Sequence, residues 1–310
     1  MYSFAPISAC DLASCGCVTA LGCFDGLHIG HRKLLTHAKA EADALGLPLV
    51  VYSPESKKGQ AFLSTPEEKK ELLLTLGADL VILADFESIR QLSPSCFVEE
   101  ILIGQLNCRV ALCGYNFTFG HKAEGNAALL SELMADKNRT VHIESPVEQD
   151  GAAVSSTRVR SLLLQGEVDK AALLLGRPYS ISAEVTHGRA IGRTLGFATL
   201  NLPFPQGKII PKHGVYYCRV TTPCGIYGAI ANIGIRPTFD DRLPIPILEA
   251  HLFGFSGELY GKTVTTSLIR FMRPEKTFPD STALAAAVHA DIQTAKEMAA
   301  SDPILPKEAL

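Results

Sequence analysis

Two histidines at the start of an amphipathic segment are the first candidates for chemistry in this chain. His28 and His31 follow a short apolar run at about 18–24 and begin a helical pattern at about 30–45. On the first turn of a helix, free backbone N–H groups and the positive end of the dipole favour phosphate. Two imidazoles there could donate hydrogen bonds to charge that develops as a bond to phosphorus breaks. The spacing therefore predicts a phosphate-handling site, although a tight turn with two exposed histidines would give the same short pattern.

The residues around the pair extend this pattern. The ten residues that end at His31 read G-C-F-D-G-L-H-I-G-H. A zinc protease motif needs histidines four residues apart with a glutamate between them, and this string has neither. Glycines in the string let a ligand approach the backbone closely; they are Gly22, Gly26 and Gly30. The string resembles the nucleotide-binding signature G-x-F-D-x-x-H-x-G-H of the adenylyltransferase superfamily. This resemblance implies that Gly22, Phe24, Asp25 and Gly26 bind nucleotide.

Composition and charge limit the class of protein. The chain has 310 residues, enough for two domains, of which 47% are apolar and 20% charged. The net charge of −3 argues against a nucleic-acid binder that relies on bulk electrostatics. Apolar runs stay far below the ~20 residues of a membrane helix, and the N-terminus lacks a signal-peptide pattern. Nine cysteines are then expected to be reduced thiols, so we expect a cytoplasmic protein without membrane or nucleic-acid partners.

The first half alternates short apolar runs with amphipathic stretches. Strands are expected at about 18–24, 48–52, 79–84, 108–113 and 139–143, and helices at about 30–45, 66–77, 95–105 and 126–136. This order predicts an α/β doubly wound parallel sheet of Rossmann-like type. Ligands of such sheets bind at the carboxyl ends of the strands, where the histidine pair would lie. Two short helices follow, and we expect the boundary between domains 1–176 and 177–310 after them.

The second half has the texture of a small all-β domain. Short runs rich in Val, Ile, Thr and Tyr are separated by Gly, Pro and Asn. The expected strands are at about 180–186, 214–221, 226–232, 247–254 and 263–271. Their spacing predicts a small antiparallel β-barrel. The alanine-rich segment at about 281–299 predicts a C-terminal helix with one face against the barrel.

Two further motifs of the first half carry polar groups. A glycine-bracketed loop at 113–120 places Asn116 at the mouth of the predicted sheet. Ser155, Ser156 and Arg158 lie at the start of a predicted helix, where hydroxyls and a guanidinium suit phosphate. A loop whose phenylalanines pack into the core, and a plain helix cap with a solvated arginine, would give the same patterns.

The second half contains a glycine-rich loop and a carboxylate inside a strand. The loop at 187–201 is of a kind whose N–H groups can cradle phosphate, but it lacks the Gly-Lys-Ser/Thr ending of a P-loop. Its candidate binding residues are Gly188, Arg193 and Gly196. Further along, Arg236 follows one apolar strand and Glu249 lies within another. A carboxylate in an apolar strand is usually paired or functional, unless it faces solvent.

Taken in order, these motifs resemble the bacterial bifunctional riboflavin kinase/FMN adenylyltransferase (FAD synthetase) family from about Thr19 to Phe278. The resemblance implies that the C-terminal domain uses ATP to phosphorylate riboflavin to FMN. It implies that Thr199 and Asn201 hold Mg²⁺ and ATP phosphate, and that Glu249 is the general base. It implies that FMN then attacks the α-phosphate of ATP in the N-terminal domain, giving FAD and pyrophosphate. The family positions expected to orient that reaction are matched by His28, His31, Asn116, Ser155, Ser156 and Arg158.

One stretch departs from the family pattern. The family has Thr-Phe-x-Pro-His-Pro after its second strand, whereas residues 51–56 read Val-Tyr-Ser-Pro-Glu-Ser. Glu55 would repel a triphosphate unless Mg²⁺ or the following lysines compensate. An alternative is therefore a riboflavin kinase with a degenerate adenylyltransferase domain. A non-enzymatic flavin-binding regulator and an adenylyltransferase for another substrate are further alternatives, and the oligomeric state is left open.

Overall fold

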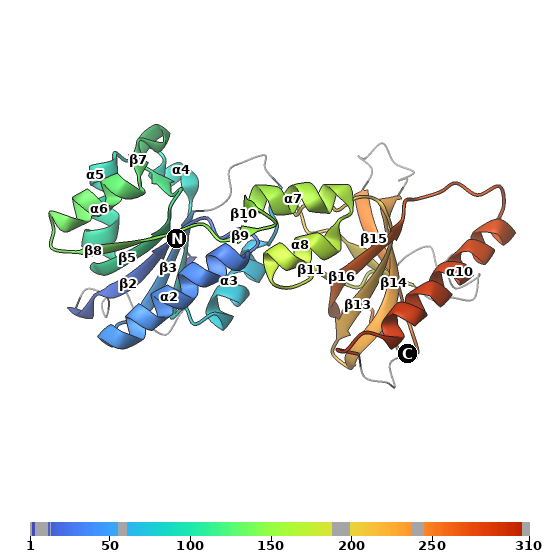
Figure 1. Cartoon of the computed structure of the whole chain (residues 1–310). Helices are drawn as coiled ribbons and strands as arrows, with labels where there is room; N and C mark the ends of the chain where they lie inside the picture. Colours follow the sequence, from blue (N-terminus) through green and yellow to red (C-terminus); the bar gives the residue numbers. More distant parts are fainter. Residues whose placement is uncertain are drawn as a thin grey trace. The chain divides into compact units, whose positions relative to one another are not determined.

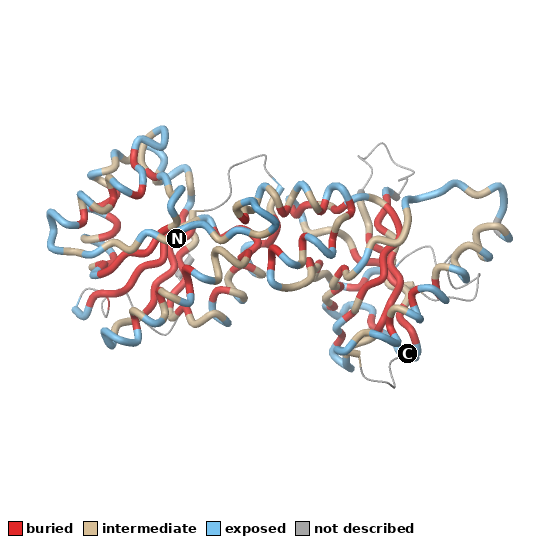
Figure 2. Tube along the Cα trace, viewed as in Figure 1, coloured by how far each residue is buried: buried red, intermediate tan, exposed pale blue. Residues whose placement is uncertain are grey.

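The computed structural model describes residues 2–3, 12, 14–54, 61–187, 199–236 and 245–305. The chain divides into two compact units, Met1–Ser156 and Thr157–Leu310. Figure 1 shows the elements of each unit, and Figure 2 shows that buried positions concentrate along the strands. Among the described residues, no helix is both long enough and apolar enough to cross a membrane.

The division falls before two helices that the sequence patterns placed in the first domain. These are α7 (Ser156–Gln165) and α8 (Val168–Leu175). Helix α8 contacts strands β11 (Tyr179–Glu184) and β16 (Thr263–Arg273) of the second unit. The Lys212 N–H also donates to the Leu163 carbonyl of α7 at 3.0 Å. The observed division therefore precedes the boundary expected between 176 and 177, because both helices are joined to the second unit.

The first unit is built on a six-stranded sheet with the order β1-β4-β3-β2-β5-β8. Neighbouring strands run parallel, except that β1 pairs antiparallel with β4. The strands are β1 (Tyr2–Ser3), β2 (Cys17–Leu21), β3 (Leu49–Pro54), β4 (Leu80–Ala84), β5 (Cys108–Gly114) and β8 (Thr140–Glu144). The predicted doubly wound parallel sheet is confirmed, and the short β1 is an addition that the sequence patterns did not indicate.

Helices cover both faces of this sheet (Figure 1). They are α2 (Ile29–Leu45) and α3 (Pro66–Thr75) on one face, and η1 (Phe97–Gln105) and α6 (Ala127–Ala135) on the other. Along β5, Leu112 belongs to the core under α2, whereas Ala111 and Cys113 belong to the opposite core. Successive strand residues point to opposite faces, and here both faces are covered, so the strands read as continuous apolar runs.

Shorter elements connect the main ones. They are α4 (Phe86–Ile89), α5 (Pro94–Cys96), η2 (His121–Ala123) and the strands β6 (Thr118–Phe119), β7 (Gly125–Asn126), β9 (Glu148–Gln149) and β10 (Ala152–Ala153). The helix expected at 95–105 is present, but most of it winds with the wider π-type hydrogen bonding of η1.

The second unit is a nearly closed antiparallel barrel with the strand order β11-β16-β13-β14-β15-β12. The remaining strands are β12 (Leu200–Pro203), β13 (Gly214–Thr222), β14 (Gly225–Arg236) and β15 (Ile245–Leu252). The two edges of the sheet meet where the Thr186 N–H, just after β11, donates to the Asn201 carbonyl of β12 at 2.9 Å. The predicted barrel is confirmed, and β12 completes it.

Helix α10 (Ser281–Ala300) packs against the barrel. Its apolar side chains Ile292, Ala295 and Ala299 share a core with Phe253. A bidentate ion pair adds to this contact, because Arg273 of β16 donates from Nε and Nη2 to the Asp291 carboxylate at 2.6–3.0 Å. Both side chains are largely buried. The C-terminal helix is therefore held to the barrel by packing and by a charged hydrogen-bonded pair.

Replacing Asp291 by Ala should loosen α10, because it leaves the Arg273 guanidinium poorly solvated and without its partner. We expect a loss of about 2 kcal/mol, which corresponds to roughly 30-fold faster amide exchange in β16 and α10. Hydrogen exchange with mass spectrometry measures this segment by segment. Lys170→Ala, which removes an exposed ion pair with Glu167 in the same unit, is the matched control and should leave exchange unchanged. Equal protection in both variants would contradict the assigned role of the pair.

Candidate active sites

The turn after β2 brings His28 and His31 together. Their ring centroids are 3.7 Å apart with an interplanar angle of 15°, and the Phe24 ring packs edge-on to His31 with centroids 5.2 Å apart. His28 caps helix α2, because its Nδ1 accepts a hydrogen bond from the His31 N–H at 3.3 Å. A Cβ on Gly30 would lie only 3.2 Å from the His28 ring. The glycine between the histidines therefore leaves the room that the stacked pair needs.

Burial keeps both imidazoles neutral. Desolvation lowers the pKa of His28 to about 4. Desolvation, followed by the charges of His28 and Lys69, lowers the pKa of His31 well below its ordinary value. Since His28 Nδ1 accepts a hydrogen bond, the proton of its neutral ring is on Nε2, which can donate to a ligand. His31 Nδ1 is buried and has no hydrogen-bond partner in the described part of the chain.

Lys69 is a buried cation beside this turn that the sequence reasoning missed. It lies in α3 and is 4% exposed. Its Nζ donates to the Cys23 carbonyl at 2.9 Å and to Ser53 Oγ at 3.4 Å. Ser53 Oγ donates to the same carbonyl at 2.9 Å. In sequence, Lys69 precedes a second lysine on a short helix rich in charges, a pattern that indicates a solvated face rather than a buried group.

Asp25 organises the backbone around the turn. Its buried carboxylate accepts hydrogen bonds from the N–H groups of Leu63 and Ser64 at 2.9–3.2 Å. Its carbonyl accepts from Ser156 Oγ at 2.8 Å. These contacts hold the segment before α3 and the segment before α7 to the β2–α2 turn. A direct contact between Asp25 and nucleotide stays a prediction, as do those of Gly22, Phe24 and Gly26.

The other predicted residues of the first site come from two further segments of the chain. Asn116 is exposed and follows β5, whose end pairs with the end of β2 through Cys113 and Leu21. It therefore lies at the same edge of the sheet as the histidine turn. Ser155 directly precedes α7, and Arg158 lies within α7 in the second unit. Their roles toward a nucleotide stay predictions.

The stretch that departs from the family pattern is only partly described. Tyr52 is buried in the sheet core and packs edge-on against Phe97, with ring centroids 5.8 Å apart. Burial raises its pKa to about 12, so its hydroxyl stays protonated. Ser53 belongs to the hydrogen bonds of Lys69. Glu55 and Ser56, on which the alternative of a degenerate domain depends, lie outside the described residues.

Strand register assembles the second site in the barrel. Glu249 of β15 lies opposite Asn201 of β12 on one side and opposite Asn232 of β14 on the other. Thr199 lies two residues before Asn201 and directly precedes β12. Asn201 is 4% exposed, and its Oδ1 has no hydrogen-bond partner among the residues that the structure describes. The partly exposed Glu249 thus lies between two amide side chains, one of which has a free buried acceptor.

Asn232 and Glu275 are additional polar residues of this site. Asn232 Nδ2 donates to Glu275 Oε1 at 3.2 Å. A Cβ on Gly234 would lie 2.2 Å from the same carboxylate oxygen, so the Glu275 side chain would have to move if this glycine were replaced. The sequence patterns noted the segment around Asn232 but gave it no role. The predicted residues Gly188, Arg193 and Gly196, and the side chain of Arg236, lie outside the described part of the chain.

The two units thus define a protein class: an α/β nucleotidyltransferase-type unit joined to a barrel with a carboxylate-centred site. The FAD synthetase family model matches residues 11–158, and the riboflavin kinase family model matches residues 175–299. One segment matches each unit, and residues 159–174, with most of α7 and most of α8, lie between the two matches.

Curated relatives match the whole of this arrangement. A bifunctional riboflavin kinase/FMN adenylyltransferase from Haemophilus influenzae is 34% identical, with 91% of this chain and 94% of that protein covered. The protein of the same name from Bacillus subtilis is 33% identical, with 90% and 91% covered. The chain therefore belongs to the bifunctional riboflavin kinase/FMN adenylyltransferase family, and the resemblance inferred from the motifs is confirmed.

A solved structure has the same fold over both units. It is a crystal structure described as a macrolide-efflux protein from Streptococcus pneumoniae, with a TM-score of 0.83 and 29% sequence identity. The match covers 91% of this chain and 94% of that one.

Replacing Lys69 by Met should raise the pKa of His31, because it removes a positive charge that disfavours the imidazolium form. The value should stay below that of an ordinary histidine, since the ring remains buried. An NMR titration of the imidazole C–H signals measures this shift. Lys70→Met, at the next position of α3, is the control and should leave the titration unchanged. No difference between the two variants would contradict the electrostatic coupling.

Proposed function

We propose that the chain makes FMN and FAD in two steps. The barrel transfers the γ-phosphate of ATP to riboflavin, and the first unit transfers an adenylyl group from a second ATP to FMN. The observation that carries this proposal is the register of Glu249 between Asn201 and Asn232, in a chain whose named relatives are matched over nine-tenths of their length. The eight described cysteines are all free thiols, which favours the expected cytoplasmic location.

In the barrel, Glu249 is the general base. It accepts the proton of the ribityl 5′-hydroxyl while that oxygen bonds to the γ-phosphorus and ADP leaves. Its partial exposure leaves the carboxylate open to a substrate hydroxyl, and the amide side chains opposite it in the register carry no charge that would neutralise it. Asn232 donates a hydrogen bond to Glu275, and this contact positions strand β14 beside Glu249.

The donor set of this site fits Mg²⁺. The buried Asn201 Oδ1 has no partner within the described residues, and amide and hydroxyl oxygens are hard ligands of the kind that this ion takes. Asn201 Oδ1 and the Thr199 hydroxyl would hold it. When bound, Mg²⁺ would offset the negative charge on the ATP phosphates.

In the first unit, a phosphate oxygen of FMN bonds to the α-phosphorus of ATP and pyrophosphate leaves. A phosphate monoester is already an anionic nucleophile, so this site needs orientation and hydrogen-bond donors rather than a strong base. The neutral imidazoles of His28 and His31 supply N–H donors, and the start of α2 supplies backbone N–H groups. Asn116, Ser155, Ser156 and Arg158 are assigned to the same phosphates through the family resemblance.

Chromatography of products from riboflavin, ATP and Mg²⁺ tests both steps at once. The wild-type protein should form FMN first and then FAD. His31→Ala should stop at FMN, with FAD formation lowered about 100-fold or more, since a donor to the developing charge is lost. Glu249→Gln should lower FMN formation by about 100-fold or more, yet still convert supplied FMN to FAD.

The pattern of products distinguishes the alternatives. FMN that accumulates without FAD, even from supplied FMN, would identify a riboflavin kinase with an inactive first unit. Flavin binding without either product would identify a non-enzymatic regulator. Loss of both activities in either single variant would contradict the assignment of one reaction to each unit.

Asn201→Ala should raise the Mg²⁺ concentration needed for half-maximal FMN formation by about tenfold or more, because it removes a ligand oxygen. Initial rates at a series of Mg²⁺ concentrations measure this change. Conversion of supplied FMN to FAD by the same variant is an internal control and should be unaffected. An unchanged Mg²⁺ dependence of the kinase would contradict the ligand role of Asn201.

A further inference from the structure

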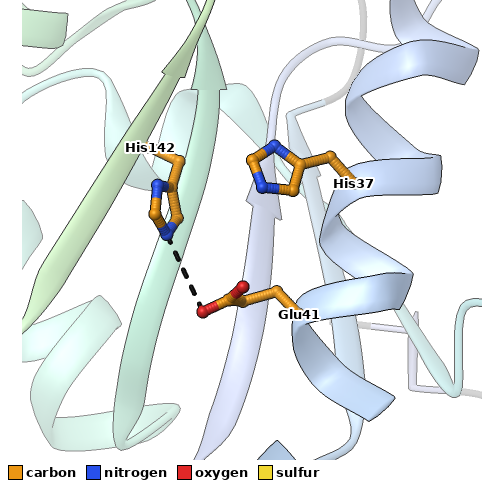
Figure 3. A group of neighbouring side chains, drawn as sticks. All are labelled: His37, Glu41 and His142. Carbon is orange, nitrogen blue, oxygen red and sulfur yellow. Dashed lines mark ion pairs between the residues drawn. The ribbon is translucent and has the colours of Figure 1, made fainter. Parts of the chain in front are cut away.

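A second group of chemistry-bearing side chains lies in the first unit, away from the turn that holds the stacked histidines. His37 and Glu41 lie one turn apart on α2, and His142 lies on the edge strand β8. Figure 3 shows the three side chains converging from these two elements. One ligand atom from each lies within 4.8 Å of the other two. We propose that His37, Glu41 and His142 form a binding site for a divalent transition-metal ion, with Zn²⁺ as the ion that its donors fit best.

The donor chemistry selects the class of ion. Two imidazoles and one carboxylate are the protein ligands of many zinc sites that keep a fourth position open. Imidazole nitrogen suits Zn²⁺ and its first-row neighbours, whereas Mg²⁺ and Ca²⁺ prefer an all-oxygen set. The site therefore differs in kind from the oxygen-donor site at Asn201 in the barrel.

The distances between the three side chains are close to those between the ligands of a tetrahedral metal site. His142 Nε2 lies 3.8 Å from Glu41 Oε1, and the ring centroids of His37 and His142 are 5.1 Å apart. Ligands about 2.0–2.1 Å from a tetrahedral Zn²⁺ lie roughly 3.3 Å from one another. The side chains are 31–40% exposed. Small rotations within their own rotamers can therefore bring the donor atoms to this spacing without moving the backbone.

A carboxylate outside the trio orients His37. His37 Nδ1 lies 2.5 Å from Glu144 Oε1, and an ionised carboxylate can only accept, so the ring proton is on Nδ1. This leaves the lone pair of Nε2 free for a metal ion. Figure 3 shows a ring nitrogen of His37 turned toward His142 and Glu41. Histidine ligands commonly donate their second ring N–H to a carboxylate, which fixes both the tautomer and the ring orientation.

The charges around the trio favour a cation. Glu144 is paired with both His37 and Lys33. Lys33 Nζ lies 3.2 Å from Glu144 Oε2 and offsets one of the two negative charges, which leaves the carboxylate of Glu41 for the ion. Without an ion, Glu41 and His142 would form only an ion pair that depends on protonation of His142.

A bound ion would join α2 to the edge of the sheet. Helix α2 begins at the stacked histidines, and β8 continues into Ser145, which accepts a hydrogen bond from Lys33 at 3.3 Å. Because the two elements are distant in sequence, the site exists only in the folded unit. An ion that binds the folded state alone stabilises it in proportion to its concentration and affinity. The expected result is a first unit that is more resistant to unfolding when Zn²⁺ is present.

Metal binding itself is the test, so the result does not depend on either activity. Full-length protein is stripped with a chelator and titrated with Zn²⁺ against a chromophoric competitor, without ATP or flavin. The wild type should bind Zn²⁺ with micromolar or tighter affinity, and Glu41→Gln and His142→Ala should each lose this binding. Glu144→Gln should weaken it by about 10–100-fold, since only the orienting carboxylate changes. His121→Ala, which removes another histidine of the same unit, is the matched control and should bind as the wild type does.

Co²⁺ distinguishes this site from the exposed thiols. Bound to the trio, Co²⁺ should show visible ligand-field bands without the ultraviolet charge-transfer bands of a cobalt–thiolate bond. Hydrogen exchange with Zn²⁺ should slow in α2 and β8 of the wild type but not of His142→Ala. Binding of equal strength in the wild type and in a His37→Ala/His142→Ala double variant, or a thiolate spectrum in both, would overturn the proposal. The group would then be only an ion-paired contact between α2 and β8.

Discussion

The junction between β2 and α2 is the constraint on which the first unit depends. Strand β2 ends in a tight turn with Phe24 and Leu27 in left-handed backbone conformations. Helix α2 begins directly after this turn, at the residue that follows its cap, His28. His28 fills this capping position, so the group that closes the helix is also the group proposed to bind the phosphates. A capping side chain is fixed by its own hydrogen bond, which gives the candidate site a preorganised imidazole.

This arrangement also determines the electrostatics of the site. A buried cation, Lys69, bonds to the carbonyl of Cys23 in the same turn and discourages protonation of His31. The site therefore combines neutral donors with one fixed positive charge and the dipole of α2. Such a set can receive a polyphosphate without protonation of the imidazoles, because the positive charge is already carried by lysine and by the helix.

The barrel obtains its site by a different physical route. Among the described residues of the barrel, the antiparallel register brings Glu249 beside its neighbours, and a shift by one residue would turn the carboxylate to the other face. Closure through β12 therefore contributes to the proposed site, since it supplies Asn201 opposite the proposed base, Glu249. In both units a backbone hydrogen-bond pattern positions the side chains, which explains why motifs distant in sequence form two compact sites.

The sequence by itself determined the order and type of most elements and the two fold classes, and it named the candidate residues of each site. It could do so because apolar periodicity, turn glycines and the cap at His28 are local signals. Only the tertiary structure decided that Lys69 is buried, that Asn232 bonds to Glu275 and that α7 and α8 belong with the barrel. It also brought Glu41 of α2 next to His142 of β8. These features depend on desolvation and on contacts between residues far apart in the chain, which local periodicity does not encode.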